Sequence, residues 1–232
     1  MTAELSTPEF WVAAVQIVIV NILLSGDNAV VIALACRNLP PKQRRWGVFW
    51  GAFGAIALRI VLTVFALSLL ALPWLKLVGG VLLLWIGIKL IAEEEGDEEI
   101  AGSDRLFSAV KTIVIADLVM SLDNVLGVAA AANGSVILLA FGLLVSIPLV
   151  VVGSQLILKL IQRFPILVVG GGALLGYIAG EMFVREPVLE PFIDAHAHWL
   201  HWALPIICAV LVVAVAKLLS GRRDARRRTG PS

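Results

Sequence analysis

Two short stretches place carboxylates and amides inside sequence that is otherwise apolar. The sequence SGDN at Ser25–Asn28 recurs as SLDN at Ser121–Asn124, which is 96 positions later. An ionisable residue at the middle of a membrane helix costs about 2.5–3.5 kcal/mol on insertion scales, so it is a functional-site candidate by default. The recurrence therefore indicates a duplicated membrane unit with a polar site at its centre.

The polar side chains around each motif share one face of a helix, because residues spaced i, i+4 and i+7 do so. Asp27 and Asp123 lie about 100° from the asparagines that follow them, and they join this face if the helix opens locally, which Gly26 makes easier in the first motif. Carboxylate, amide and hydroxyl oxygens are hard ligands that suit Mn²⁺, Ca²⁺ or Mg²⁺, whereas Cu⁺ and Zn²⁺ favour Cys or His. The alternative is that these polar residues only hydrogen-bond helices together. The candidate metal ligands are Asn21, Ser25, Asp27, Asn28, Asp117, Ser121, Asp123 and Asn124.

Three other charged residues lie in apolar stretches. We expect Arg59 to pair with one of the aspartates and to hold the site until a cation displaces it, with a purely structural ion pair as an equal alternative. Lys89 is expected to extend toward the cytoplasmic surface. Glu181, in the corresponding place of the second half, is a candidate for lining an outer exit path.

Composition places the chain among membrane proteins. Its 232 residues are 60% hydrophobic and only 15% charged, and the mean hydropathy is +0.98. These values favour a lipid bilayer as the surroundings, and the net charge of +1 gives no reason to expect a nucleic-acid partner. Cys36 and Cys208 form neither a disulfide framework nor a CxxC metal motif, and the N-terminus lacks the basic region of a removable signal peptide.

The apolar segments predict an all-α membrane protein with seven transmembrane helices. A span needs about 20 apolar residues, and prolines and Asn-Gly pairs separate the candidates. The expected spans are 9–36, 48–72, 74–92, 109–132, 135–159, 165–183 and 200–219.

The two halves of the chain repeat each other. GGVLLLWI at Gly79–Ile86 in the third span matches GGALLGYI at Gly171–Ile178 in the sixth. Three spans per half force the second half to be upside down, which is the inverted-repeat plan of secondary transporters; the alternative is that small apolar helices look alike by composition. We expect Gly172, Gly176 and Gly180 to form a stripe for close helix packing.

This plan predicts an order of segments along the chain. It comprises a first three-helix repeat (1–92), an acidic cytoplasmic linker (93–108), a second, inverted repeat (109–183), an external loop (184–198), a seventh helix (199–220) and a basic cytoplasmic tail (221–232).

Basic residues predict the orientation. They gather after the first, fifth and seventh expected spans, all of which end on the same side, whereas the N-terminus carries Glu4 and Glu9 and no Lys or Arg. Positively charged connections stay in the cytoplasm, so the N-terminus is expected outside and the C-terminus inside. The basic residues are Arg37, Lys42, Arg44, Arg45, Lys159, Arg163, Arg222, Arg223, Arg226, Arg227 and Arg228.

Three histidines precede the last span. His196, His198 and His201 form His-x-His-x-x-His, which is able to bind a transition metal, although such a run at a membrane interface is also common as plain polar sequence. The sequence contains no serine elbow, HExxH, Walker loop or dinucleotide fingerprint, so no enzymatic activity and no prosthetic group is predicted.

The two motifs resemble the TerC family of integral membrane proteins, and within it the YjbE-like subfamily. The resemblance is carried by NILLSGDNAVVIALA at Asn21–Ala35 and DLVMSLDNVLGVAAA at Asp117–Ala131, and the seven-span layout extends it over almost the whole chain. It implies a multi-pass protein of the bacterial cytoplasmic membrane that exports Mn²⁺ from the cytoplasm, driven by protons or another gradient, with Asp27-Asn28 and Asp123-Asn124 as the motif residues.

Other functions stay open at this point. One is a membrane-embedded factor for the assembly or metalation of other proteins, and another is Ca²⁺ transport by the same site. An intramembrane hydrolase is disfavoured because no nucleophile and base occur at matched depths. Self-association into a homo-oligomer is left open.

Overall fold

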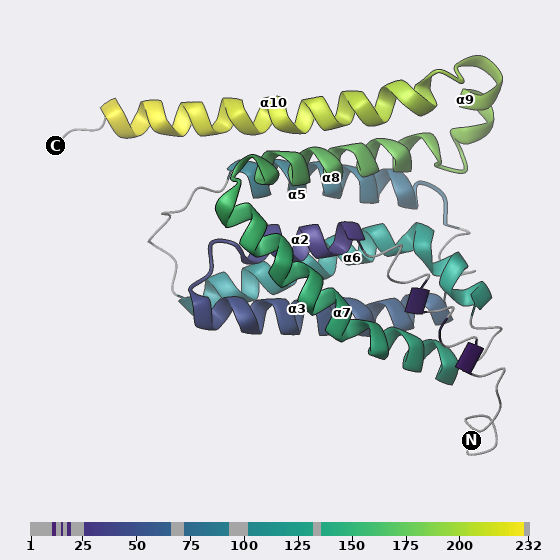
Figure 1. Cartoon of the computed structure of the whole chain (residues 1–232). Coiled ribbons are helices and arrows are strands. Elements are labelled where there is room, and N and C mark those ends of the chain that lie inside the picture. Colours follow the sequence, from purple (N-terminus) through teal and green to yellow (C-terminus); the bar gives the residue numbers. More distant parts are fainter. Residues whose placement is uncertain are drawn as a thin grey trace. The chain divides into compact units, whose positions relative to one another are not determined.

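The computed structural model describes part of the chain in detail. The backbone is described for residues 11, 12, 15, 18, 19, 26–65, 72–92, 102–131 and 136–229. Side chains are described in the same ranges except at 64, 102, 103, 123–131, 136–142, 146 and 222–229. The regular structure of these residues is helical, with no strand among them (Figure 1). The contacts divide the chain into two compact units, residues 1–72 with 102–159 and residues 73–101 with 160–232.

The described part of the first unit is built from α2 (Gly26–Cys36), α3 (Pro41–Val64), α6 (Gly102–Ala131) and most of α7 (Val136–Arg163). Helix α3 packs along α6, and α2 contacts both of them. Gly51, Ala55 and Arg59 are spaced i, i+4 and i+8 and so share one face of α3. A Cβ added at Gly51 would press onto the Ile113 side chain of α6. Small residues therefore bring α3 close to α6 and aim Arg59, two turns later, at the same helix.

The described part of the second unit contains α5 (Leu75–Ala92), α8 (Ile166–Val184), the short α9 (Glu190–His196) and α10 (Leu200–Thr229). Helix α8 packs against both α5 and α10. A Cβ at Gly176 would lie 2.7 Å from the Cys208 carbonyl oxygen, and one at Gly180 would lie 2.8 Å from the Leu204 carbonyl oxygen. At Gly172 the added atom would collide with Ile91. The predicted small-residue stripe is confirmed as a close packing surface.

The contact between α5 and α8 is reciprocal. A Cβ on Gly87 would lie 3.2 Å from the Gly172 carbonyl oxygen, and a Cβ on Gly80 would lie 3.1 Å from that of Ala179. The matched GG segments pair Gly80 with Gly172 and Gly87 with Ala179. Exchanging the two helices therefore turns one contact into the other, as a local two-fold relation between antiparallel helices requires.

In the part of the chain that the structure describes, five helices are long and apolar enough to cross a membrane. Their apolar stretches are Pro41–Thr63, Leu75–Ala92, Leu143–Arg163, Ile166–Val184 and Leu200–Gly221. Their outer faces are apolar: the α3 residues Trp46, Phe49, Trp50 and Phe53 form an exposed cluster of stacked and edge-on rings. Lipid is the solvent in which such faces are favourable.

The expected spans and the helices agree in part. The third, sixth and seventh expected spans begin within one residue of α5, α8 and α10. In the described residues the expected span 9–36 is represented by α2, a shorter apolar helix, and by isolated positions before it. The expected span 109–132 lies in α6, which begins at Gly102 inside the segment expected as a linker, and α6 is not among the five candidates. Seven spans therefore remain a prediction.

Candidate metal-ion site

A buried ion pair joins α3 to α6 in the first unit. Arg59 donates from Nη2 to Asp117 Oδ1 at 2.5 Å and from Nε to the Ser121 hydroxyl at 2.9 Å. Ser121 in turn donates to Asp117 Oδ2 at 3.1 Å. The exposed fractions of Arg59, Asp117 and Ser121 are 1%, 4% and 0%. The expected pairing of Arg59 with an aspartate is confirmed, and Asp117 is the partner.

This cluster is held by side chains on both sides of the contact. Asp117 and Ser121 are one turn apart on α6, so they present a carboxylate and a hydroxyl to the same guanidinium. Thr63 donates its hydroxyl to the Arg59 carbonyl oxygen at 2.7 Å, one turn further along α3. Removal of one partner of a buried pair leaves an uncompensated charge, which costs about 3–5 kcal/mol. The two charges therefore depend on each other.

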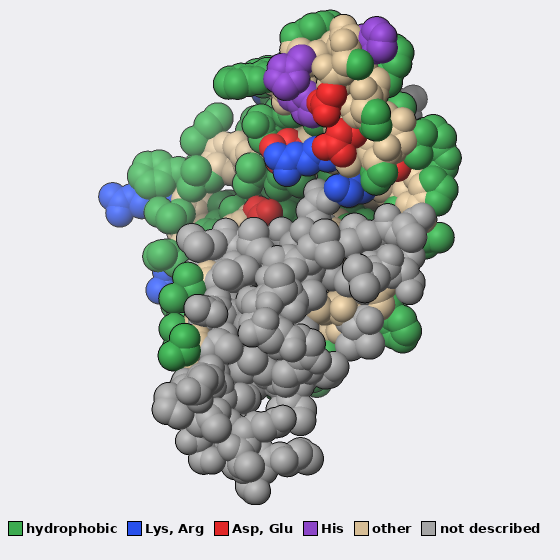
Figure 2. Space-filling view, turned by 90° about the vertical axis from the view of Figure 1, so that its right-hand side faces the viewer, with side chains coloured by type: hydrophobic (Ala, Val, Ile, Leu, Met, Phe, Trp, Pro, Cys, Tyr) green, Lys and Arg blue, Asp and Glu red, His purple; other side chains and the backbone are tan. Residues whose placement is uncertain are grey.

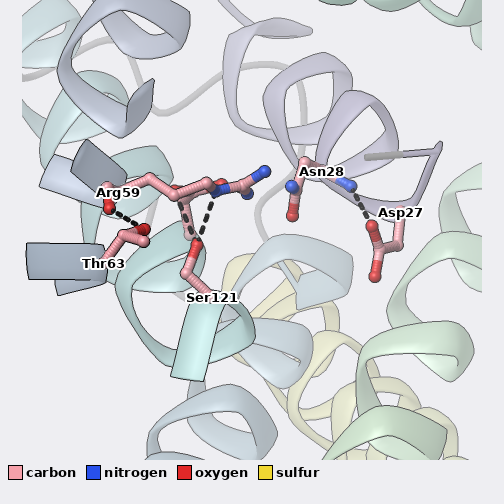
Figure 3. Close-up of polar contacts among 6 residues, drawn as sticks. Asp27, Asn28, Arg59, Thr63 and Ser121 are labelled. Carbon is pink, nitrogen blue, oxygen red and sulfur yellow. Dashed lines mark hydrogen bonds and ion pairs between the residues drawn. The ribbon is translucent and has the colours of Figure 1, made fainter. Parts of the chain in front are cut away.

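The first motif approaches this cluster from α2. Asn28 is 5% exposed, and its side-chain oxygen Oδ1 is buried and makes no hydrogen bond to any described residue. Its backbone N–H donates to Asp27 Oδ1 at 2.8 Å, in the first turn of α2. In Figure 3 the Arg59 side chain extends toward Asn28, and Asp27 lies on the far side of Asn28. A buried oxygen without a partner is costly, at about 1–3 kcal/mol, and calls for an explanation.

A small cavity lies among α2, α3 and α6. Its volume is about 10 Å³, and its lining residues are the polar Asn28 and Asp117 and the apolar Val31, Ile32, Ala55 and Ile113. This is about the space that one water molecule needs. Asn28, which carries the partnerless amide oxygen, and Asp117 thus line a space that fits a single small occupant. Such an occupant would find hard oxygen ligands, which suit Mn²⁺, Mg²⁺ or Ca²⁺.

The remaining candidates fall into three groups. Asn21 and Ser25 lie outside the described residues, and Asp123 and Asn124 lie on α6 where side chains are not described. Glu181 accepts a hydrogen bond from Arg185 at 3.3 Å near the end of α8, and the two side chains are 33% and 53% exposed. Lys89 lies over the Trp85 ring at 5.6 Å. Of the eight predicted ligands, the structure places Asp27, Asn28, Asp117 and Ser121, and it brings Asn28 and Asp117 to one cavity.

One buried carboxylate was not anticipated from sequence. Glu186 is fully buried, and it accepts hydrogen bonds from the backbone N–H groups of Trp74, Lys76 and Leu77 at 2.9, 3.1 and 3.2 Å. It thereby caps the N-terminus of α5 from a position more than 100 residues away. The sequence contains one indication of such a contact. Pro73-Trp74 precedes α5 without a local Ser, Thr, Asp or Asn, so the first N–H groups of the helix need an acceptor from elsewhere.

Comparison with known proteins identifies the family. The model of the integral membrane protein TerC family matches residues 6–224, and the chain therefore belongs to this family. It is thus an integral, multi-pass membrane protein in contact with a lipid bilayer.

Its relatives are bacterial membrane proteins. The chain is 42% identical to the uncharacterized membrane protein YjbE of Bacillus subtilis over 205 residues, 88% of this chain and 94% of the relative. It is 27% identical to the Bacillus subtilis membrane protein YceF, over 98% of this chain and 90% of that protein. It is 25% identical to the inner membrane protein YgdQ of Escherichia coli, over 70% of this chain and 76% of that protein. No solved structure matches the chain. The expected likeness to YjbE is confirmed, and these names give no substrate.

Proposed function

We propose that this protein exports divalent metal ions, Mn²⁺ first among them, from the cytoplasm in exchange for protons. The observation that carries the proposal is the cavity in the first unit, which is lined by Asp117 and by Asn28, whose side-chain oxygen has no hydrogen-bond partner among the described residues. Both are hard oxygen ligands, and the carboxylate supplies the negative charge that a divalent ion needs.

In this scheme the positive charge of Arg59 replaces that of the transported ion when the site is empty. Its guanidinium neutralises Asp117 while no metal is bound, because a lone carboxylate in an apolar environment is strongly unfavourable. A divalent ion that enters the cavity competes with Arg59 for the Asp117 and Ser121 oxygens. In this scheme the ligand set is completed by the side chains of Asp27, Asp123 and Asn124. Asn21 and Ser25 precede Asp27 in the same stretch of sequence.

Exchange with protons follows from the same carboxylates. A carboxylic acid in low-dielectric surroundings is either protonated or paired with a cation. When Mn²⁺ leaves to the outside, Asp117 pairs with Arg59 again, whereas Asp27 or Asp123 takes up a proton, which leaves toward the cytoplasm before the next ion binds. Mn²⁺ and protons then move in opposite directions.

The helix directions support the seven-span, inverted-repeat plan. Gly51 and Arg59 on α3 contact Ile113 and Asp117 on α6 in the same order, so these helices run parallel. The Gly80–Ala179 and Gly87–Gly172 contacts run in opposite order, so α5 and α8 are antiparallel. If each of the seven expected spans crosses the membrane once, spans two and four (α3 and α6) run parallel, and spans three and six (α5 and α8) run antiparallel. The local two-fold relation between α5 and α8 is the one that inverted repeats generate.

Charged and aromatic residues indicate on which side of the membrane each terminus lies. The α3 cluster of Trp46, Phe49 and Trp50 directly follows Lys42, Arg44 and Arg45. Tryptophan next to a basic connection is typical of the cytoplasmic interface. We propose accordingly that the N-terminus lies outside and the C-terminus inside a bacterial cytoplasmic membrane, with Glu181 near an outer exit.

A flux assay with purified protein in liposomes tests the proposal. We expect protein-dependent entry of Mn²⁺, reported by quenching of an enclosed dye, together with proton movement the opposite way. Asp117→Asn should abolish this flux, as should Asp27→Asn and Asp123→Asn, whereas Asp104→Asn, at an exposed position on α6, should not. Correct insertion of each variant is checked by its elution as a single species from a sizing column.

The outcomes separate the alternatives. Flux of Ca²⁺ that exceeds flux of Mn²⁺ would reassign the substrate and keep the site. Absence of flux for Mn²⁺, Ca²⁺ and Mg²⁺ with well-folded protein would contradict transport and favour the assembly or metalation factor.

A further inference from the structure

The structure gathers metal-ligating side chains at a second place, the turn that joins α9 to α10. Asp194, His198 and His201 each offer one ligand atom, and the three atoms lie within 4.8 Å of one another. Asp194 and His198 are exposed and His201 is partly exposed, so an ion reaches them from solution. Figure 2 shows the histidines beside acidic side chains at one end of the described surface.

The contacts within this group already have nearly the right geometry. His201 Nε2 lies 2.7 Å from Asp194 Oδ1, and the rings of His198 and His201 have centroids 5.2 Å apart. Ligand atoms around a tetrahedral Zn²⁺ are about 3.3 Å apart, given metal–ligand distances of about 2.0–2.1 Å. The widest separation in the group, at most 4.8 Å, must therefore shrink by no more than about 1.5 Å for all three atoms to bind one ion.

The backbone holds the turn in place. Ala197 donates its N–H to the Ile193 carbonyl oxygen at 2.8 Å, and Leu200 donates to Ala197 at 2.8 Å. His201 donates its N–H to the His198 carbonyl oxygen at 3.2 Å. These bonds fix the positions of the ligand-bearing residues before any ion binds, which lowers the entropy cost of binding.

His196 does not belong to the group, although sequence spacing placed it with the other two histidines. Its ring stacks on Phe192 with centroids 4.7 Å apart, and its Nδ1 lies 3.2 Å from the Phe192 carbonyl oxygen, to which it donates. Asp194 and His196 are both on α9, two residues and so about 200° apart around the helix, and only one of them can face the turn. Asp194 takes the third place instead.

We propose that Asp194, His198 and His201 form a binding site for a borderline transition-metal ion of the Zn²⁺, Co²⁺ and Ni²⁺ class. Two imidazoles and one carboxylate are the ligands such ions prefer, and three protein ligands leave a position open for water. Mn²⁺ stands at the weak end of the affinity order for such a site. The site thus differs in chemistry from the oxygen-lined cavity of the first unit, and its existence does not depend on the transport proposal.

Titration of the full chain in detergent with Zn²⁺ tests this assignment, using protein without a histidine tag and a fluorescent chelator as competitor. We expect one Zn²⁺ per chain at this site and an affinity at least about tenfold weaker in Asp194→Ala, His198→Ala and His201→Ala, given the size of such effects for groups that only support a ligand. His196→Ala is the matched control and should bind as the unchanged protein does. Co²⁺ should give a visible absorption band that His198→Ala removes.

Three results would overturn the proposal. One is Zn²⁺ binding by the His198→Ala/His201→Ala double variant that equals that of the unchanged protein. Another is a loss in His196→Ala as large as in His198→Ala, which would restore the three-histidine set. The third is an effect of Asp194→Ala on thermal stability alone, which would leave Asp194 as a plain ion-pair partner of His201.

Discussion

Among the described residues, each unit has one buried carboxylate, and the two units hold it in different ways. Asp117 in the first unit is neutralised by the Arg59 side chain and accepts from the Ser121 hydroxyl. Glu186 in the second unit accepts from three backbone N–H groups at the start of α5. A side chain can rotate away from its partner, whereas backbone amides at a helix start cannot move without unwinding the helix. The first arrangement is suited to exchange of a partner, and the second to permanence.

The surroundings of the two carboxylates also differ, with free space beside Asp117 and close packing in the unit that contains Glu186. Asp117 lines a cavity together with Asn28, whose amide oxygen has no hydrogen-bond partner among the described residues. The second unit is packed by glycines against backbone, with Gly176 facing Cys208 and Gly180 facing Leu204. Among the described residues, the polar-lined cavity thus lies in the first unit, and the close contacts between glycines and backbone lie in the second.

Loss of Asp117 should have the largest effect. Asp117→Asn leaves the Arg59 charge buried without its carboxylate, so we expect a loss of about 3–5 kcal/mol of stability as well as loss of flux. The double change Arg59→Gln/Asp117→Asn should recover most of this stability, measured by thermal unfolding in detergent, and should still transport nothing. Arg45→Gln, at an exposed position on α3, is the control for loss of an arginine. Recovered flux in the double variant would show that the pair is purely structural.

Loss of Glu186 should affect stability without affecting turnover. Glu186→Gln removes the charge that strengthens three hydrogen bonds, and we expect a cost of about 1.5–3 kcal/mol from hydrogen bonds to a charged group. Flux per correctly folded molecule should remain unchanged, with the folded amount measured by sizing chromatography. Reduced flux per folded molecule would erase the distinction between the two carboxylates.

Added volume at the glycine stripe should destabilise the second unit. Gly180→Ala brings a methyl group against the Pro205 backbone, which cannot rotate aside, so we expect a cost of about 1–3 kcal/mol. Gly170→Ala, where an added Cβ meets nothing within 4 Å, is the matched control on the same helix. Equal melting temperatures for the two variants would mean that α8 and α10 are not closely packed.

Truncation of Asn28 should reduce flux with little effect on stability, which is the opposite of what we expect for Glu186→Gln. Asn28→Ala removes an oxygen that has no hydrogen-bond partner among the described residues, so stability should change by less than about 1 kcal/mol. We expect Mn²⁺ flux at low metal concentration to fall by about tenfold, which corresponds to about 1.4 kcal/mol of lost binding. A large loss of stability with unchanged flux would assign Asn28 to helix packing.

Sequence predicted those features that depend on neighbours along the chain. Helices α5, α8 and α10 were anticipated because each has a proline or a polar turn before a long apolar run. The start of α3 was placed too late because Lys42, Arg44 and Arg45 were taken as a loop, although charged residues continue a helix at the edge of a membrane. The end of α2 and the glycine stripe were also predicted correctly.

Features that depend on the rotation and approach of helices were not predictable in detail. Sequence indicated that Arg59 would pair with an aspartate, but the choice of Asp117 depends on how α3 faces α6. The cap supplied by Glu186 joins residues about 110 positions apart, and no local pattern encodes such a contact. The choice of Asp194 over His196 depends on which face of α9 is turned toward His201.

The cap on α5 also bears on how the protein is made. Trp74, at φ 68°, and the first turn of α5 leave the ribosome more than 100 residues before Glu186 does. During that interval the N–H groups at this end of α5 have no Glu186 to accept their hydrogen bonds, and they must be satisfied by water or by the insertion machinery. The start of α5 is completed only when α8 has been synthesised, so this segment reaches its final form late in biogenesis, whatever its place in the chain.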